Sequence, residues 1–493
     1  MSSHGIDFGT TNSVVARYDS RSGHVLAFRD RTSNRPHPSV VWYRGDKIEV
    51  GKEAKHQIRE FAGVTGHAFI SSVKRKLGKN HSFSIFGEKK PAYDVASEIF
   101  KYLRQQARAS YEDDIENVVL TVPVYFDGQA RSELRKAANL AGIEIKTFVH
   151  EPFAAVIGYY CGGGRNIEAL DRSTILVFDW GGGTLDITIA RIEKSQIYEL
   201  ATAGLNDIAG DHFDDRLEHF ARSRFLDRSG FREDILALRP GTPARLISEC
   251  ERAKINLSDA LADRIQVAQF FQRDSRQYDL DEPVTRDDLG KLISDDIHAA
   301  LRQVDKAIDE ASLSAEEIDL ALLIGGSSRI PMLRTEMQNR FGGRTVEVPN
   351  ADTIIAEGAA IVAANGWLPY LARPVQVHLA DKSLYTVFES GWVLKPEVSR
   401  KEMNFYCTDN REGKARLVIV ESMRPGDSSS VQNKQILTIS VSANLPRPYN
   451  HERVSTRFEI DENLVLCVSA WSATQQAVAR ASVHDLCFGL RVG

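Results

Sequence analysis

Two stretches of the chain repeat the same order of apolar and polar positions. The first is IDFGTTNS at residues 6–13, followed by an alternating run up to Tyr18, and the second is FDWGGGTLDIT at residues 178–188. In both, an apolar segment carries an aspartate, breaks at glycine and small residues, and resumes with alternation, which is typical of a β-hairpin. The repetition predicts an internal duplication of the fold.

A second pair of segments supports the duplication. Residues 118–123 form an apolar run before a helical pattern at 128–141, and residues 322–324 form a similar run before GGSSRIP and a helix through Met332 and Leu333. Such runs predict buried strands, and strand ends that open into helix N-termini are the ligand-binding edges of open α/β sheets. The chain is therefore predicted to contain two matching α/β halves.

The pattern changes after Trp367. Short alternating runs at 415–420, 436–441 and 464–469 are separated by turns of Gly, Pro, Ser and Asn. This alternation predicts an antiparallel β-domain.

The glycine turns point to phosphate binding. Because glycine lacks a Cβ, successive backbone N–H groups can converge on an anion, and threonine hydroxyls add donors. Two facing hairpins would hold a polyphosphate, and the preceding Asp7 and Asp179 would hold Mg²⁺ largely through water. One Gly cluster alone is more often a plain turn, but two copies with matching aspartates favour the phosphate site. The P-loop pattern GxxxxGK[ST] is absent.

Composition and charge narrow the class of protein. The 493 residues are 42% hydrophobic and 26% charged, with a formal net charge of -5, which is typical of a globular protein and offers no basic field for nucleic acid. The five cysteines lie far apart, which favours a reducing compartment over disulfides or a zinc site. With neither a signal-peptide pattern nor an apolar run of about 18 residues, we expect a cytoplasmic protein without membrane contact.

Five motifs together resemble the ATPase domain of the heat-shock 70-kDa (DnaK-type) chaperones. They are IDFGTTNS, HEPFAAVIGYY, FDWGGGTLDIT, CERAKINLS and LLIGGSSRIP, in family order within residues 5–367. The resemblance implies the α/β fold of the actin/hexokinase ATPase superfamily, with two duplicated actin-like lobes around a nucleotide cleft, followed by a small all-β sandwich. The implied divisions are lobe I at 1–166, lobe II at 167–368, a linker at 369–384 and a substrate-binding-like β-domain at 385–493.

The resemblance also assigns roles in an ATP and ADP site with Mg²⁺ and K⁺. Lys74 is similar to the family's catalytic lysine, which places a cation at the γ-phosphoryl group, and Glu151 to the glutamate that orients the attacking water. Without the resemblance, Lys74 would be read as part of a basic turn, and Glu151 as a helix N-terminal carboxylate. The implied catalytic set is Lys74, Glu151, Asp179, Thr184 and Asp186, with Asp7 and Asp179 at the metal. The implied ATP-binding residues are Gly9, Thr10, Thr11, Asn12, Gly181, Gly182, Gly183, Gly210, Glu251, Lys254, Ser258, Gly325, Gly326, Ser327, Arg329 and Asp352.

The base would be held by a helix. Glu251, Lys254 and Ser258 are spaced by three and four, which puts them on one helical face; an ordinary solvated face has the same spacing. The sequence departs from the family at Ile255, where an arginine usually stacks on adenine. It also departs at Trp180, usually a smaller apolar residue, and at Ala209, usually glycine.

The resemblance gives the β-domain a client as well. It implies binding of unfolded or extended polypeptide segments, with a J-domain co-chaperone and a nucleotide exchange factor as further partners. Phe405, Leu417 and Ile419 are candidates for the pocket, although a role in the sandwich core is expected more often for such residues. Pro123 and Arg131 resemble the pair that relays nucleotide state. The sequence after the β region contains no helical lid, so we expect a client to exchange quickly.

Three functions stay open on the sequence. The first is an ATP-hydrolysing chaperone whose peptide binding is under nucleotide control, which the retained Asp7, Lys74, Glu151, Asp179 and Thr184 favour. The second is a nucleotide-dependent interaction module dedicated to one partner, with slow or no hydrolysis. The absent lid favours it, and so does the linker, where PVQVHLAD at 374–381 lacks the leucine-rich acidic pattern of the family. The third, a small-molecule kinase, shares the superfamily fold, but fold alone does not settle function.

Overall fold

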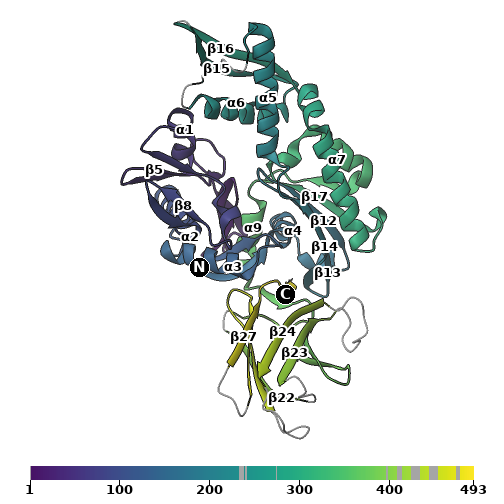
Figure 1. Ribbon diagram of the computed structural model, residues 1–493. Coiled ribbons are helices and arrows are strands. Elements are labelled where there is room, and N and C mark those ends of the chain that lie inside the picture. The colour runs from purple at the N-terminus through teal and green to yellow at the C-terminus, as the bar shows by residue number, and fades with distance from the viewer. Residues whose placement is uncertain are drawn as a thin grey trace.

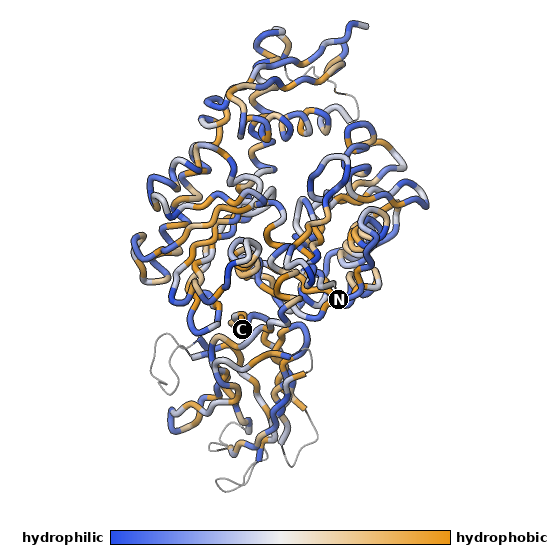
Figure 2. The backbone as a smooth tube through the Cα atoms, turned by 180° about the vertical axis from the view of Figure 1, so that it is seen from behind, coloured by the Kyte–Doolittle hydropathy of each residue, from blue (hydrophilic) through white to orange (hydrophobic). Residues whose placement is uncertain are grey.

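Two α/β lobes stand side by side in the computed structural model, and a β-domain lies against their lower end (Figure 1). The structure describes residues 2–232, 238, 241–273, 275–395, 398–407, 413–422, 434–442, 453–472 and 478–493. Apolar stretches follow the central strands of both lobes, and hydrophilic stretches form many of the outer loops (Figure 2). Burial of the apolar strands therefore organises each lobe.

Lobe I is built on a mixed sheet with the order β11-β10-β1-β2-β3, and β4 also pairs with β2. β1 and β2 form an antiparallel hairpin that closes at Phe8 and Ser13, while β1 runs parallel to β10. The first predicted hairpin is thus confirmed. The strands are β1 (Ser2–Phe8), β2 (Asn12–Asp19), β3 (His24–Phe28), β4 (His37–Pro38), β10 (Asn117–Val122) and β11 (Glu144–His150).

Lobe II repeats this arrangement and then extends it. Its sheet has the order β18-β17-β12-β13-β14-β28-β19, and the first five strands match those of lobe I in order and direction. The predicted duplication is confirmed by this correspondence. The strands are β12 (Thr174–Trp180), β13 (Leu185–Glu193), β14 (Gln196–Leu205), β17 (Leu320–Ile324), β18 (Thr345–Glu347), β19 (Leu368–Leu371) and β28 (Phe488–Arg491).

Helices cover the two sheets and meet between them. Those of lobe I are α1 (Lys52–Phe61), α2 (Ala92–Tyr111), α3 (Gly128–Leu140) and α4 (Glu151–Cys161). Those of lobe II are α5 (Gly210–Ser229), α6 (Thr242–Leu257), α7 (Arg286–Glu310), α8 (Pro331–Phe341) and α9 (Ile354–Asn365). α4 and α9 cross so closely that a Cβ on Gly358 would lie 1.8 Å from the Ala154 carbonyl oxygen, so glycine is required there.

The predicted helix at 128–141 corresponds to α3. Asp127 caps it, because its carboxylate accepts a hydrogen bond from the Ala130 N–H. Smaller sheets complete the lobes: β5 (Val41–Arg44) with β6 (Lys47–Val50) and β7 (His67–Ile70), β8 (Ser82–Ile85) with β9 (Glu88–Pro91), and β15 (Ala262–Arg273) with β16 (Arg276–Thr285).

The β-domain contains two four-stranded antiparallel sheets, with the orders β21-β20-β23-β24 and β22-β25-β26-β27. Their strands are β20 (Val375–His378), β21 (Leu384–Phe388), β22 (Ser399–Tyr406), β23 (Lys414–Glu421), β24 (Lys434–Ser442), β25 (Arg453–Ile460), β26 (Leu466–Ser472) and β27 (Val478–Val483). Buried positions alternate along β25, as expected for a strand with one face in a core. The range 369–384, predicted as a linker, contains β20 and most of β19.

Three apolar clusters hold these parts together. The buried residues of lobe I and of the β-domain form one continuous cluster, those of lobe II form a second, and a third fills the space around α4 and α9. The β-domain therefore packs on lobe I through a shared core. Within the described part of the chain, no helix is both long and apolar enough to span a bilayer. All five cysteines are unbridged.

Candidate functional site

A cavity of about 1240 Å³ lies in the cleft between the lobes. Both predicted phosphate loops, the predicted metal aspartates and the predicted adenosine-binding residues line it. The lining includes Asp7, Gly9, Thr10, Thr11, Asn12, Lys74, Pro123, Glu151, Asp179, Gly181, Gly182, Gly183, Thr184, Asp186, Gly210, Glu251, Lys254, Ser258, Gly325, Gly326, Ser327, Arg329 and Asp352. Of the predicted nucleotide and relay residues, Arg131 alone lies outside this lining.

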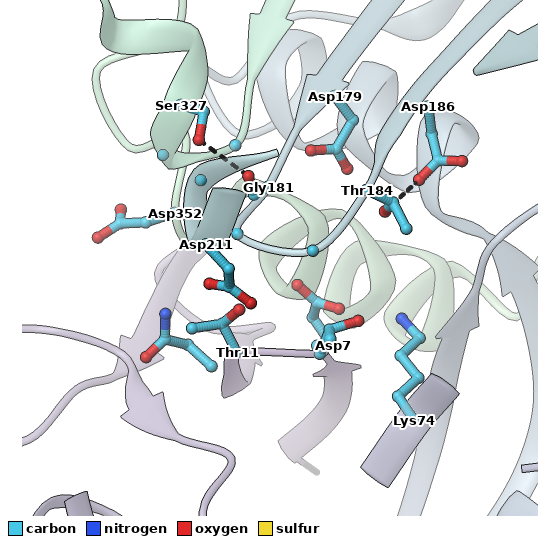
Figure 3. Close-up of a pocket in the computed structure, with 18 of the residues that line it drawn as sticks. Asp7, Thr11, Lys74, Asp179, Gly181, Thr184, Asp186, Asp211, Ser327 and Asp352 are labelled. Atoms are coloured by element: carbon cyan, nitrogen blue, oxygen red, sulfur yellow. Dashed lines mark hydrogen bonds between the residues drawn. The ribbon is translucent and has the colours of Figure 1, made fainter. Parts of the chain in front are cut away.

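The two hairpin turns face each other across the cavity (Figure 3). A Cβ on Gly182 would lie 2.4 Å from Thr11 Oγ1, so the turn of lobe II closely approaches that of lobe I. The Thr11 hydroxyl is buried and has no hydrogen-bond partner. A buried hydroxyl of this kind needs a partner, and a phosphate oxygen would provide one.

Loops from lobe II hold the second turn in place. Gly181 N–H donates to the Thr184 carbonyl oxygen (3.1 Å), and the Gly181 carbonyl accepts from the hydroxyl of Ser327 (2.9 Å). The Gly182 carbonyl accepts from the Asp211 N–H (2.8 Å) at the start of α5. Gly325 has a φ of 77°, in the left-handed region that favours glycine. The turn is thus fixed by its neighbours.

Acidic side chains gather on the side of the cavity beyond the turns. Lys74, from the short helix η1 (Val73–Lys76), donates to the Glu151 carboxylate over 2.6 Å, and both side chains are buried. Glu151 is the first residue of α4 and also lines the cleft, so it is both an N-terminal helix carboxylate and a residue of the site. The Asp186 carboxylate accepts from the hydroxyl of Thr184 (2.8 Å). Figure 3 shows Asp7, Asp179 and Asp186 around the same space as Lys74.

The pKa values show that this cluster needs more positive charge. Burial and the Glu151 carboxylate raise the pKa of Asp7 to about 7 and that of Asp186 to about 6. Burial, Glu151 and Asp186 together raise the pKa of Asp179 well above its ordinary value. Burial would lower the pKa of Lys74, but Glu151 and Asp7 outweigh it and raise that pKa.

A divalent cation fits this environment. Carboxylate oxygens are ligands that Mg²⁺ prefers, and a bound cation would favour the ionised forms of Asp7 and Asp179. Among the described residues, no three His, Cys, Asp or Glu side chains are close enough together to hold a metal directly. Two carboxylates such as Asp7 and Asp179 fit a cation that keeps part of its water shell.

The helix predicted to hold the base is α6, and Glu251 and Lys254 lie on it while Ser258 directly follows it. Lys254 donates to the Gly210 carbonyl oxygen (2.7 Å) and to the Asp214 carboxylate (2.8 Å). Glu251 accepts from Lys55 of α1 over 2.6 Å, and Ser258 follows the last residue of the helix. Burial would raise the pKa of Glu251, but Lys55 outweighs burial and lowers it.

The three departures from the family have distinct surroundings. Ile255 lines the cavity and is 36% exposed, so an apolar surface stands there. Trp180 is fully buried, and its indole N–H donates to the Ile208 carbonyl oxygen over 2.9 Å. Ala209 is buried and immediately precedes α5. The Trp180 ring is therefore accommodated by the lobe II core.

Three interactions of the cleft were not predicted from the sequence. The Arg75 guanidinium donates to the Gly183 carbonyl oxygen and so joins η1 to the second phosphate turn. The Lys55–Glu251 pair joins the lobes across the top of the cleft. Arg29 makes two hydrogen bonds of 3.0 Å with Asp352. All three contacts join residues far apart in sequence. Only Arg75 had a signal in the sequence, because it lies in the same basic run as Lys74.

Arg131 points away from the cavity, toward the β-domain. Its side chain is buried and donates to the carbonyl oxygens of Asn463 (2.7 Å) and His484 (3.0 Å). The end of β11, the strand that follows α3, carries His150, which is also buried and whose two ring nitrogens have no hydrogen-bond partner. Burial, and then Arg131, lower the pKa of His150 to about 3. This surface of lobe I is thus covered by the β-domain.

The peptide-binding candidates lie on strands of the two different sheets of the β-domain. Leu417 and Ile419, on β23, are buried in the sandwich core, which is the alternative role given above. Phe405, on β22, is half-buried, and its ring meets that of Tyr385 edge-on at 6.0 Å. Only Phe405 of the three therefore offers a partly accessible apolar surface.

Comparison with known proteins identifies relatives along almost the whole chain. A family model described as Hsp70 protein matches residues 3–92 and 82–485. The chaperone protein DnaK of Deinococcus radiodurans is 29% identical over 98% of this chain and 79% of its own length. The DnaK proteins of Mycoplasma mobile and Thermotoga maritima are each 28% identical over 98% of this chain, and over 78% and 80% of their own lengths.

Proposed function

The chain belongs to the Hsp70 family and has the ATP-dependent chaperone function of that family; from this premise we propose that its cleft hydrolyses ATP to ADP and phosphate. We further propose that its β-domain binds extended polypeptide segments under nucleotide control. The same proposal includes a cytoplasmic location, a J-domain co-chaperone and a nucleotide exchange factor. These three parts of the proposal rest on the similarity to the DnaK relatives.

The buried Lys74–Glu151 pair carries the proposal for hydrolysis. The raised pKa keeps Lys74 positively charged, beside the space that the facing turns leave for a polyphosphate. Phosphoryl transfer depends mainly on positioning and charge stabilisation, so a fixed cation at the γ-phosphoryl group is what the reaction requires. Glu151 would accept a hydrogen bond from the attacking water and hold it in line with the bond that breaks.

Other residues would bind and orient the nucleotide. The backbone N–H groups of Gly182 and Gly183 and the Thr11 hydroxyl would donate to phosphate oxygens. Asp7 and Asp179 would hold Mg²⁺ through water, and the bound metal would neutralise phosphate charge. K⁺ is proposed as a further ion beside the carboxylates. α6 and the Gly325–Gly326 loop would enclose the nucleoside.

Single-turnover hydrolysis of ATP with Mg²⁺ and K⁺ tests the proposal. Lys74→Ala should lower the rate by about 10²–10³-fold, the effect typical of losing one group that stabilises charge in the transition state. Lys76→Ala is the matched control, because Lys76 lies in the same short helix but is exposed, and it should keep the wild-type rate. Tight ATP binding without hydrolysis by the wild-type chain would instead favour a partner-specific module switched by nucleotide.

Peptide binding is tested separately in the β-domain. Phe405→Ala should weaken binding of a fluorescein-labelled peptide of five leucines flanked by arginines, because it removes partly accessible apolar surface. Ile419→Ala is the contrasting variant, because Ile419 is fully buried and its truncation should mainly lower the stability of the domain. Unchanged peptide affinity in Phe405→Ala would remove Phe405 from the proposed pocket.

A further inference from the structure

β28 occupies an unexpected place in the sheet of lobe II. It follows the strands of both β-domain sheets and falls within the range 385–493 predicted for that domain, yet it lies between β14 and β19 in the sheet of lobe II. Ile197 of β14 pairs with Leu490, which also pairs with Pro369 of β19, and the Val492 N–H donates to the Ser195 carbonyl oxygen (2.9 Å). A segment that follows the strands of the β-domain sheets thus extends the ATPase sheet by strand addition.

The side chains of this segment enter two different cores. Phe488 belongs to the apolar cluster that lobe I shares with the β-domain, and it is 4% exposed. Leu490 and Val492, at 1% and 0% exposure, belong to the cluster around α4 and α9. Residues 488, 490 and 492 are spaced by two and so lie on the same face of an extended segment, and this face spans the boundary between the two clusters. The segment therefore has packing contacts in both clusters.

Phe488 brings β28 within one residue of the catalytic pair. Its ring lies 4.1 Å from that of His150, measured between centroids, and the Arg131 guanidinium lies 5.5 Å from its centre. His150 directly precedes Glu151, which accepts the hydrogen bond of Lys74. A change in the position of Glu151 would therefore reach the packing of Phe488 through the adjacent His150.

The residues just before β28 attach the same segment to lobe I and to the β-domain. The His484 carbonyl oxygen accepts from the Gly128 N–H (3.2 Å) at the start of α3. The Cys487 N–H donates to the buried Glu421 carboxylate of β23 (2.9 Å), and the Cys487 carbonyl accepts from the Ala372 N–H (3.0 Å). Residues 484–492 are consequently bonded to both lobes and to the β-domain.

We propose that β28 couples the nucleotide state of the cleft to the affinity of the β-domain for polypeptide. A strand that is hydrogen-bonded to lobe II and packed on lobe I cannot keep both sets of contacts when the lobes rotate. Its displacement changes the support of β23 and of the loops that meet α3, and hence the peptide site. The contacts of β28 would then differ between two positions of the lobes, which is what a coupling free energy requires. This inference rests on the function proposed above.

Gly489 provides a sharp way to test the strand. A Cβ at this position would lie 2.4 Å from the Ile197 carbonyl oxygen and 2.7 Å from the Tyr370 ring. Gly489→Val should therefore push β28 away from its two neighbours without touching the nucleotide cavity. Gly343→Val is the matched control, because a Cβ on Gly343 would meet open space in lobe II.

The experiment measures release of the labelled leucine peptide after addition of ATP or of ADP. In the wild-type chain and in Gly343→Val, the two release rates should differ by at least about 5-fold, the lower end of ordinary allosteric coupling. In Gly489→Val the ratio should fall to about one while the chain still binds peptide. A ratio in Gly489→Val equal to that of wild type would overturn the role of β28 and leave the proposed function intact. A wild-type chain that neither hydrolyses ATP nor binds peptide would instead overturn the proposed function.

Hydrogen exchange gives a second test in the unaltered chain, independent of how Gly489→Val folds. Amides of residues 488–492 should exchange at rates that differ by at least about 5-fold between the ATP and ADP states, because the strand's pairing changes. Amides of β26, which lies inside the β-sandwich, serve as the internal control and should be unchanged. Equal protection of residues 488–492 in both states would overturn the proposal.

Discussion

Lobe I and lobe II are copies of one plan that differ in what is attached to it. Both place two parallel strands beside an antiparallel hairpin, and both turn that hairpin toward the cleft. Lobe I then adds Lys74 on a short helix and Glu151 at the start of α4. Lobe II adds β28 and β19 at the edge of its sheet. The shared arrangement supplies the turns that we propose to bind phosphate, while the additions supply the Lys74–Glu151 pair that we propose for catalysis and a connection to the β-domain.

The two lobes also differ in the charged groups that they bring to the cleft. Within lobe I, Glu151 has a cation of its own in Lys74. In lobe II, Asp179 has a pKa well above its ordinary value, because burial and nearby carboxylates act on it together. Lys74 opposes the rise in the pKa of Asp179 and also of Asp7, so the aspartates of both hairpins depend on a cation that neither hairpin carries.

Neutralising one acidic side chain from each lobe should produce the largest difference in the rate of ATP hydrolysis between the two lobes' variants. We predict that Glu151→Gln lowers the single-turnover rate of ATP hydrolysis by about 10²–10³-fold, because it removes the acceptor of the attacking water and leaves the buried Lys74 without its ionic partner. Asp186→Asn should lower the rate only about 10-fold, because the amide oxygen can still accept from Thr184. The measurement is phosphate release from a preformed complex with ATP.

The exposed Glu144, on the strand that leads to Glu151, provides the control for this pair. Glu144→Gln should hydrolyse ATP at the wild-type rate. Equal losses in Glu151→Gln and Asp186→Asn would mean that the two lobes contribute alike to the reaction, and the asymmetry drawn above would fail.

His150 should make the stability of lobe I depend on pH. Its pKa is about 3 in the folded chain and about 6.5 when unfolded, so its stabilising contribution is complete above pH 6.5 and is lost as the pH falls toward 3. Between pH 7 and pH 5 the free energy of unfolding should fall by about 2 kcal/mol from this residue. His150→Phe should remove that part of the fall, as measured by urea unfolding at both values.

The exposed His219 of α5 serves as the control, and His219→Phe should keep the wild-type dependence on pH. If His150→Phe loses stability between pH 7 and pH 5 as much as the wild-type chain does, the imidazole is not the buried neutral group described above.

Local pattern made the cleft predictable. The turns leave little room for a side chain at Gly9 and Gly182, and aspartates precede both turns at matching positions, so the hairpins could be predicted from a few residues. The face of α6 followed from its spacing, because helical geometry fixes which residues are neighbours. The Lys55 partner of Glu251 could not be predicted in this way, since it lies 196 residues away and the pairing depends on how the lobes close.

The edge of lobe II was unpredictable for a similar reason. The run FGLR at 488–491 is too short to have a period, and its strand pairing is decided by β14 and β19. In the β-domain, alternation showed that Leu417 and Ile419 share a face of a strand, but it could not distinguish a core face from a pocket face. Tertiary contacts determine both the pairing of β28 and the burial of Leu417 and Ile419.

The smallest effect concerns the contact that joins the lobes above the nucleotide. Lys55 and Glu251 are both partly exposed, so their ion pair should contribute only about 0.5–1 kcal/mol to closure of the cleft. We predict that Lys55→Met speeds dissociation of a fluorescent ADP about two- to fivefold and that added salt narrows the difference. Lys52→Met, on the same helix, removes a lysine whose partner Asp30 belongs to lobe I itself, so its dissociation rate should stay at the wild-type value. Equal acceleration in both variants would show that positive charge on α1, and not a bridge between the lobes, retains the nucleotide.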